Sequence, residues 1–384
     1  MGASNEKGEP GRSILNLFVG RNEKIYDIEI LPSGFGPLLQ DGTNIGITKR
    51  ALAQAFLIAR KAFFGSLKDG NAREDSVIVG QTTDSPTNTN IRVASEIILL
   101  FDSEHLTVCN WRKRRICALR SSLPASDYAR SLKEELSFTA TLLRSPLHRH
   151  AKSPTLWYHR YWVMTEVLRL DPCHIQSVLL EIPQMQSSVD DVMISEKLLQ
   201  REFAVGLKAG VQHPMNYYAF SYLRQLLDLL SRFRDRGLDL LNSEMTRQKH
   251  GDILTTPLNS DIQLHSFQDM ASVLLEGMHR WCLDHPPDIS GWTFLLYLLE
   301  VVADAPLQTV MVEKTIKYAL DVGWEGEALW VFVALAISNF RLDLEAFSRM
   351  DHGITRRDNE AGHATQIRRH WADLAAQAKA HFKE

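Results

Sequence analysis

The sequence predicts an all-α protein built as a right-handed solenoid, a crescent of stacked antiparallel helical hairpins. Apolar residues recur every three or four positions over long stretches, as from Leu132 through Leu136 to Leu143, which is the spacing of one helix face. Alternation with a period of two is confined to residues 25–31, which we interpret as a short extended arm. A similar segment also returns five times along the chain, which is typical of repeat architectures.

Turn-forming and polar stretches divide the chain into predicted regions. Residues 1–45 are expected to form a partly disordered N-terminal arm, followed by a helix and a flexible loop over 46–91. Residues 92–345 hold about five helical repeats, with an insertion near 234–261 that we interpret as a loop. Residues 346–384 are predicted as a loop and a C-terminal helix.

Each repeat is recognised by a bulky or sulfur-containing residue near the start of a helix. The five aligned residues are Cys109, Trp157, Phe220, Trp292 and Trp330. The unequal spacings between them fit hairpins of two helices, some of which carry insertions. We expect the repeat core to be formed by Trp111, Trp157, Phe220, Trp292 and Trp330. Deleting a buried ring of this kind typically costs about 3 to 5 kcal/mol.

Composition limits the class of protein. The 384 residues carry 43 basic and 46 acidic side chains and a formal charge of -3, which excludes wholesale disorder and a surface that is one broad nucleic-acid footprint. The four cysteines form no Cys-x-x-Cys pair, which indicates reduced thiols without a zinc knuckle. The start of the chain is polar, and the longest uncharged apolar run, residues 328–337, is too short to cross a bilayer. We expect a soluble cytoplasmic protein without membrane insertion.

The sequence holds no self-sufficient active site. Phosphate-binding glycine loops, the His-Glu-x-x-His zinc motif and the Gly-x-Ser-x-Gly nucleophile motif are all missing. His148 and His150 lie close together, but no carboxylate or cysteine follows at ligand spacing, which favours a solvated loop over a metal site. We therefore expect no catalytic residue and no metal ligand in this chain.

Three segments carry a resemblance to a known family. Residues 156–160 read Leu-Trp-Tyr-His-Arg and residues 216–220 read Asn-Tyr-Tyr-Ala-Phe. Both resemble Asn-Tyr-x-x-Trp-x-His-Arg, the signature of the protein prenyltransferase alpha-subunit repeat. Residues 285–292, His-Pro-Pro-Asp-Ile-Ser-Gly-Trp, resemble a later repeat of that family. The divergent copies, over about residues 92–340, are more similar to the alpha-subunit-repeat-containing protein of geranylgeranyltransferase type III than to the farnesyltransferase alpha subunit.

The resemblance implies an alpha-like, non-catalytic subunit of a heterodimeric protein prenyltransferase. In this family the zinc ion and the isoprenoid diphosphate belong to the beta subunit, so neither is expected in this chain. The implied reaction is geranylgeranyl transfer to C-terminal cysteines of small GTPases or SNARE proteins. This chain would stabilise the beta subunit and shape the choice of protein substrate. The alternative is a helical-repeat scaffold that binds peptides or proteins without enzyme activity.

The motif predicts a role for its tryptophan and its arginine. Trp157 and Arg160 lie three residues apart and hence on one helix face, so the indole is expected between the paired helices. The guanidinium would reach a backbone or carboxylate group of the neighbouring hairpin. Other repeats depart from the motif. Leu223, Leu295 and Val333 stand where the arginine belongs, which predicts that these repeats lose a polar clasp.

The resemblance also implies a partner or substrate surface beside the repeats. We expect it to include His159, Arg160, His213, Asn216, Tyr217, Tyr218, Arg112 and Arg115. Asn216 could instead simply cap its helix. The basic run 112–115 is open to three interpretations: a solvated helix face, a surface for an acidic partner or a diphosphate, or contact with RNA or the nuclear import machinery. Met215 replaces a lysine that the family places over the lipid diphosphate.

Overall fold

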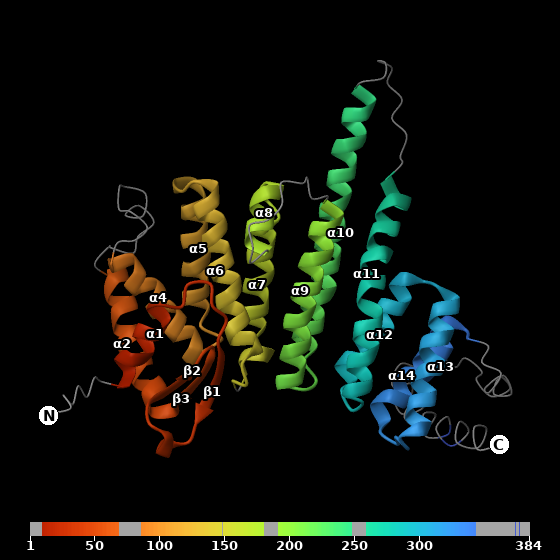
Figure 1. Cartoon of the computed structure of the whole chain (residues 1–384), viewed down its shortest axis with the longest axis horizontal. Helices are drawn as coiled ribbons and strands as arrows, with labels where there is room; N and C mark the ends of the chain where they lie inside the picture. Colours follow the sequence, from red (N-terminus) through yellow and green to blue (C-terminus); the bar gives the residue numbers. More distant parts are fainter. Residues whose placement is uncertain are drawn as a thin grey trace. The chain divides into compact units, whose positions relative to one another are not determined.

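The computed structural model describes most of the chain as helix, with one small sheet near the N-terminus (Figure 1). The residues that it describes are 10–68, 86–147, 149–179, 191–247 and 259–342, together with Asp373 and Ala376. The chain divides into two compact units. The first contains Met1–His213 and Ser221–Leu229, and the second contains Pro214–Phe220 and Leu230–Glu384.

The first unit begins with a helix and a three-stranded sheet. These elements are α1 (Pro10–Val19), β1 (Asp27–Leu31), the 3-10 helix η1 (Ser33–Phe35), β2 (Leu38–Asp41) and β3 (Asn44–Thr48). The strand order is β1-β3-β2, with β3 parallel to β1 and antiparallel to β2. The all-α prediction therefore describes most of the chain but missed this sheet. The physical reason is that β2 is short and largely exposed, so it lacks the alternation that reveals a half-buried strand.

Helix α6 (Ala125–Arg144) covers the free edge of β1. The N–H of Tyr26 donates to Thr141 Oγ1 at 3.0 Å, and the N–H of Ile28 donates to Ser145 Oγ at 2.9 Å. These hydroxyl groups satisfy backbone donors that an edge strand leaves unpaired. The prediction of an N-terminal arm did not anticipate this packing, because the partner hydroxyls lie more than a hundred residues further along the chain.

The rest of the first unit consists of helical hairpins around α6. Its other helices are α2 (Lys49–Lys68), α4 (Pro86–Phe101), α5 (Leu106–Ser122), the 3-10 helix η2 (His150–Lys152), α7 (Pro154–Val167), α8 (Pro172–Leu179) and α9 (Asp191–Gln212). Helix α6 contacts α5, α7, α8 and α9, and α2 lies against α4. The second half of α6 is buried almost without interruption, which identifies it as the centre of this core.

The second unit contains two further hairpins. Its helices are α11 (Asn259–Asp284), α12 (Ile289–Val302), α13 (Ala305–Asp321) and α14 (Glu327–Phe340), and α10 (Tyr217–Arg247) contributes residues to both units. Helix α11 packs on α12 and α13 packs on α14, while α12 also contacts α14. Equivalent helices of successive hairpins therefore lie against each other, as stacked hairpins require. The crescent shape and its right-handedness stay predictions.

Part of the predicted insertion is helical. Residues 234–247 continue α10 and residues 259–261 begin α11, where a loop was expected. This stretch of α10 is polar, but it contains Leu, Arg, Glu and Met, which are good helix formers, so polarity alone gave a wrong prediction. Residues 69–85 and 248–258 lie outside the described residues. So does the predicted C-terminal region, 346–384, apart from Asp373 and Ala376.

Candidate functional site

The five aligned repeat positions are equivalent in the structure. Cys109, Trp157, Phe220, Trp292 and Trp330 are each the fourth residue of a helix, namely of α5, α7, α10, α12 and α14. All five side chains are buried, and so is Trp111. The alignment made from sequence therefore matches the positions of these residues within their helices.

Three of these tryptophans make the same hydrogen bond. Each indole N–H donates to the backbone carbonyl six residues earlier, in the turn that enters the helix. The pairs are Trp157 with Ala151 at 2.7 Å, Trp292 with Pro286 at 2.9 Å and Trp330 with Trp324 at 3.0 Å. A buried indole N–H needs such a partner, and here it ties the turn to the first helical turn.

Polar side chains cap three of the five helices that carry the aligned residues, namely α7, α10 and α12, whereas the residues before α5 and α14 make no such bond. Ser153 Oγ accepts from the N–H of Leu156 at 3.1 Å, and Asn216 Oδ1 accepts from the N–H of Ala219 at 3.2 Å. The second bond confirms the capping interpretation of Asn216. Asp288 caps α12 through Oδ1, and its Oδ2 accepts from the N–H of Met215 at 2.8 Å.

Arg160 clasps two neighbouring helices from within the core. Its Nε and Nη2 donate to the carboxylate of Glu202 at 2.6 and 2.7 Å. Its Nη1 donates to the Leu136 carbonyl and to Thr139 Oγ1, both at 2.7 Å. Arg160 and Glu202 are 1% and 0% exposed, so this bidentate pair is cut off from solvent. The reach predicted for this guanidinium is confirmed.

Arg112 repeats this arrangement one hairpin earlier. Its Nε and Nη2 donate to Glu135 at 2.8 and 2.6 Å, and its Nη1 donates to Ser95 Oγ at 2.5 Å and to the Arg92 carbonyl at 3.4 Å. In both clasps Nη1 bonds a helix carbonyl and the hydroxyl group three residues further on. Two successive repeats therefore share one hydrogen-bonding geometry.

A third clasp involves Arg21, which lies outside the predicted repeats. Its Nε and Nη2 donate to Glu96 at 3.4 and 3.2 Å. Nη2 also donates to the Glu134 carbonyl at 3.2 Å, and Nη1 donates to Ser137 Oγ at 2.8 Å. The same pattern of a carbonyl followed by a hydroxyl three residues later thus occurs once more, and it joins the N-terminal segment to α4 and α6.

The clasps fix the protonation of their carboxylates. Burial alone would raise the pKa of Glu135, but the Arg112 guanidinium and a hydrogen bond from His159 hold that pKa well below its ordinary range. The pKa of Glu202 is likewise lowered: burial opposes the shift, and Arg160 and Tyr222 cause it. Burial lowers the pKa of His159, although Glu135, 2.6 Å from its Nε2, acts in the opposite direction. Because Glu135, Glu202 and His159 are buried, they do not exchange protons readily with solvent, and their role is to form stable pairs inside the core.

One comparison with known proteins identifies part of this architecture. Residues 132–167 match the family model described as protein prenyltransferase alpha subunit repeat. These residues run from the first half of α6 to the end of α7, and they contain Glu135, Trp157 and Arg160. This segment is a protein prenyltransferase alpha subunit repeat. No curated protein matches the chain.

The structure buries four residues that were expected on a partner surface, two of them within the alpha subunit repeat and two outside it. Arg112, His159, Arg160 and Asn216 are 2%, 0%, 1% and 0% exposed. The surface prediction for these four is corrected, because their polar atoms are occupied inside the chain by carboxylates or helix N–H groups. Arginine and histidine usually lie at the protein surface, which is why Arg160 and His159 were expected there. In this structure both side chains are buried at the polar centre of the core.

The remaining predicted surface residues are accessible. Tyr217 and Tyr218 are 55% and 48% exposed, and Arg115 is half-buried. His213 is half-buried, and its Nε2 lies 2.8 Å from the Leu147 carbonyl. Met215, in the position of the family lysine, is 53% exposed and adopts a left-handed backbone conformation with φ of 58°.

An exposed aromatic cluster beside the repeat was not predicted. The Lys113 ammonium lies 4.2 Å from the ring centroid of Tyr158 and 5.7 Å from that of Trp162. Tyr158 is 64% exposed, and Trp162 is half-buried and stacks on His159. Large aromatic rings and a cation on one surface are typical of residues that dominate protein interfaces. The signal in the sequence was the spacing of Tyr158 and Trp162, one helical turn apart.

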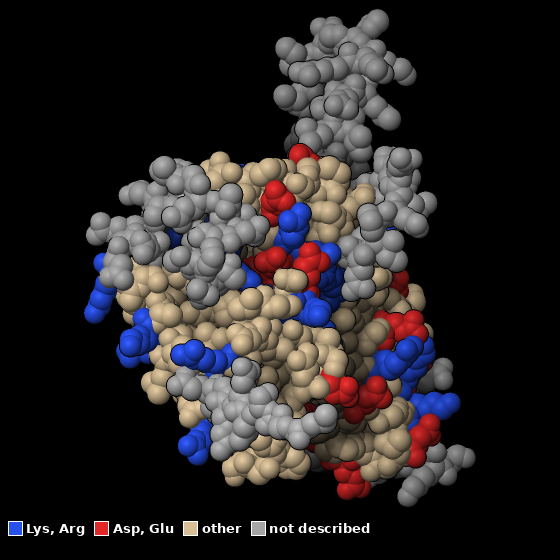
Figure 2. Space-filling model, turned by 60° about the vertical axis from the view of Figure 1, so that its left-hand side comes forward, with Lys and Arg blue, Asp and Glu red and all other residues tan. Residues whose placement is uncertain are grey.

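The basic run 112–115 is divided between interior and surface. Arg112 is buried, Lys113 and Arg115 are half-buried, and Arg114 is exposed. On the face shown in Figure 2, Lys and Arg side chains are interspersed with Asp and Glu. The interpretation as a uniformly solvated helix face is therefore wrong for Arg112.

The described part of the chain offers no cluster of side chains that could hold a metal ion. Within the described ranges, no three His, Cys, Asp or Glu side chains gather closely enough to hold a metal ion. His148 lies outside those ranges, and His150 Nε2 lies 3.1 Å from the Leu99 carbonyl. Among the same residues, no helix combines the length and the apolarity that crossing a membrane requires.

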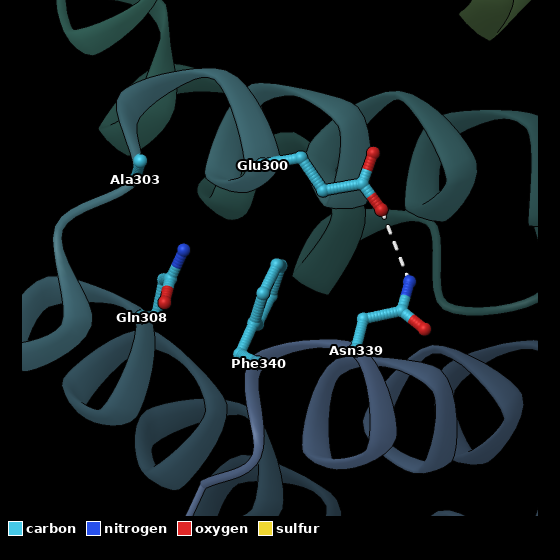
Figure 3. Close-up of a pocket in the computed structure, with 5 residues that line it drawn as sticks. All are labelled: Glu300, Ala303, Gln308, Asn339 and Phe340. Atoms are coloured by element: carbon cyan, nitrogen blue, oxygen red, sulfur yellow. Dashed lines mark hydrogen bonds between the residues drawn. The ribbon is translucent and has the colours of Figure 1, made fainter.

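An open pocket lies in the second unit (Figure 3). Its lining residues are Glu300, Ala303, Gln308, Asn339 and Phe340. The carboxylate of Glu300 accepts from Asn339 Nδ2 at 3.0 Å, and Gln308 Nε2 donates to the Leu299 carbonyl at 2.9 Å. The polar groups of this pocket are thus occupied by one another or by the backbone. They include no nucleophile paired with a base.

Sequence reasoning missed the acidic half of every clasp. Glu135 was visible as a carboxylate on the otherwise apolar stripe of α6, and a charge on a buried face requires a partner of opposite charge. Glu96 lies in a similar position on α4. Glu202 gave no local signal that would connect it to Arg160, because 42 residues separate the two.

Proposed function

We propose that this chain is the alpha-like, non-catalytic subunit of a heterodimeric protein prenyltransferase. Its reaction would be geranylgeranyl transfer to C-terminal cysteines of small GTPases or SNARE proteins in the cytoplasm. The zinc ion and the isoprenoid diphosphate would belong to the beta subunit. The chain would stabilise that subunit and shape the choice of protein substrate, as in geranylgeranyltransferase type III.

The observation that carries this proposal is the alpha subunit repeat at residues 132–167. The repeat indicates an alpha subunit of a protein prenyltransferase. Its geometry recurs beyond the matched residues, since Arg112 and Arg160 make equivalent clasps and the five aligned residues share one helix position. Repetition of this kind supports a chain built throughout from the same unit.

The exposed side chains on the helices that follow the repeat turns support a protein partner. Tyr158 lies on α7, and Tyr217 and Tyr218 open α10. All three are about half exposed or more. An exposed tyrosine provides a large contact area and loses little conformational entropy on binding, which is typical of residues at protein interfaces.

The test is coexpression of the full chain with a prenyltransferase beta subunit, followed by size-exclusion chromatography with light scattering. We expect a 1:1 complex that transfers radiolabelled geranylgeranyl groups to a small GTPase, while the isolated chain is inactive. The double variant Tyr158→Ala, Trp162→Ala should weaken the complex by about tenfold or more, because interface aromatics often contribute 2 kcal/mol or more. Phe35→Ala removes another exposed aromatic of the first unit and serves as the matched control.

The rival function is a helical-repeat scaffold that binds peptides or proteins without enzyme activity. Met215 favours it, because the family lysine that assists the lipid diphosphate is replaced by an exposed, uncharged side chain. A chain that stays monomeric and well folded with every beta subunit tried would overturn the subunit proposal. Affinity purification from cell extract should then return partners without any beta subunit.

A further inference from the structure

Helices α4, α5 and α6 enclose a cluster with more arginines than carboxylates. The arginines are Arg21, Arg92, Arg112 and Arg115, and the buried carboxylates are Glu96 and Glu135. Glu96 is shared, since Arg21, Arg92 and Arg112 approach it at 3.2, 2.8 and 3.5 Å. Glu135 pairs with Arg112 at 2.6 Å. Both carboxylates are therefore already paired with arginines other than Arg115.

Arg115 faces this cluster without a partner. It lies three residues after Arg112 on α5 and so projects from the same side of the helix. Its side chain is half-buried, and among the described residues no hydrogen bond or ion pair engages its guanidinium. Glu134 is the other acidic neighbour on α6, and its charge acts on Arg115 less strongly than that of Glu135. A second pair nearby, Lys133 with Glu23 at 2.8 Å, is neutral as a whole.

The electrostatic consequence separates Arg115 from the clasp arginines. Burial, then the positive charges of Arg112 and Arg92, lower the pKa of Arg115 to about 10, and Glu135 and Glu134 compensate only in part. The pKa of Arg112 is instead raised, because Glu135 and Glu96 outweigh its burial. Arg115 stays charged at neutral pH, so the cluster carries unbalanced positive charge at a position that solvent still reaches.

We propose that Arg115 anchors a binding site for a phosphate-class oxyanion at the edge formed by α4, α5 and α6. A guanidinium fork binds phosphate oxygens in pairs, and a partly desolvated arginine binds them more strongly than an exposed one. Arg92 and Arg112 attract the anion from a distance, while their own donors stay with Glu96 and Glu135. This site does not depend on prenyl transfer, so it stands or falls separately from the proposed function.

The test compares thermal unfolding and calorimetric titration of the full chain with inorganic phosphate and with sodium chloride at equal ionic strength. We expect phosphate, but not chloride, to raise the unfolding temperature. Arg115→Gln should lower phosphate affinity by about tenfold or more, because it removes a charge-assisted bidentate contact. Arg130→Gln is the control, since Arg130 is 62% exposed and pairs with Asp127 at 3.0 Å. It should keep the phosphate effect.

Two further measurements keep the proposal falsifiable. Arg115→Gln without phosphate should be at least as stable as the wild type, because it removes an unpaired charge; Arg115→Lys keeps the charge and should bind phosphate with intermediate affinity. Pyrophosphate and a phosphoserine peptide are titrated in parallel, and the tighter of the two identifies the source of the phosphoryl group. Equal phosphate effects on the wild type and Arg115→Gln, or no effect on the wild type beyond that of chloride, would overturn the proposal.

Discussion

At the scale of single residues, the polar centre of the first unit is a set of buried arginine–glutamate clasps. The free energy needed to remove both charges from water exceeds their mutual attraction unless every hydrogen-bond donor of the pair is satisfied. Arg160 meets that condition, with three of its nitrogens bonded to a carboxylate, a carbonyl and a hydroxyl group. The clasp therefore fixes which helices lie together, and breaking one side of it leaves an unpaired buried charge.

Arg160→Met is expected to lower the free energy of unfolding by about 3 to 5 kcal/mol, because Glu202 would stay buried without its partner. Urea unfolding followed by circular dichroism measures the change. The double variant Arg160→Met, Glu202→Leu should recover much of the loss, since apolar replacement of a whole buried pair is often neutral.

The matched control for that measurement is Arg130→Met on α6, whose salt bridge to Asp127 is exposed to solvent. It should change the free energy of unfolding by less than about 0.5 kcal/mol. A double variant as unstable as Arg160→Met alone would show that the loss comes from packing and not from the orphaned carboxylate.

At the scale of helices and turns, each repeat is set by how its second helix begins. All five helices share the buried residue at the fourth position. Three of them, α7, α10 and α12, add a capping side chain, and α7, α12 and α14 add an indole hydrogen bond to the preceding turn. These are local interactions, so the sequence pattern predicts them well. Leu223, Leu295 and Val333 are fully buried apolar side chains at the positions where the motif arginine is missing, and the loss of the clasp in those repeats stays a prediction.

Asp288→Ala is expected to destabilise the chain by about 1 to 2 kcal/mol. Its carboxylate accepts from the N–H groups of Ser290, Gly291 and Met215, and the side chain is buried. Asp304→Ala is the control, because Asp304 caps α13 through one bond to Leu307 and is exposed. It should cost about half as much, as measured by the shift in thermal unfolding. Equal shifts would contradict the role given to the extra bonds of Asp288.

At the scale of the whole molecule, buried ionisable groups make stability depend on pH. Burial lowers the pKa of His279 from 6.5 to about 4, and the pKa of His159 is also lowered. The pKa values of Glu96, Glu135 and Glu202 lie below their ordinary 4.5. In every case the unfolded chain takes up a proton at a higher pH than the folded chain, so acid favours unfolding.

Stability should therefore fall as the pH is lowered from about 7 to 4, first through the histidines and then, below about 4.5, through the glutamates. The midpoint of urea unfolding at a series of pH values measures this. His279→Gln should make the first part of the decline shallower, because glutamine takes up no proton. A flat profile between pH values of about 7 and 5 would contradict the assignment of buried neutral histidines.

The sequence by itself determined the helical hairpins, the five equivalent helix positions and the buried aromatics. Each of these depends on spacing and capping within one segment, which local composition encodes. Only the tertiary structure decided which carboxylate meets which arginine, that Arg21 joins α4 and α6, and that Arg115 has no acceptor among the described residues. The three-stranded sheet was likewise decided only by the tertiary structure. Such pairings join segments that lie far apart in the chain. They become favourable only when both partners are buried together, so the sequence of either segment alone does not predict them.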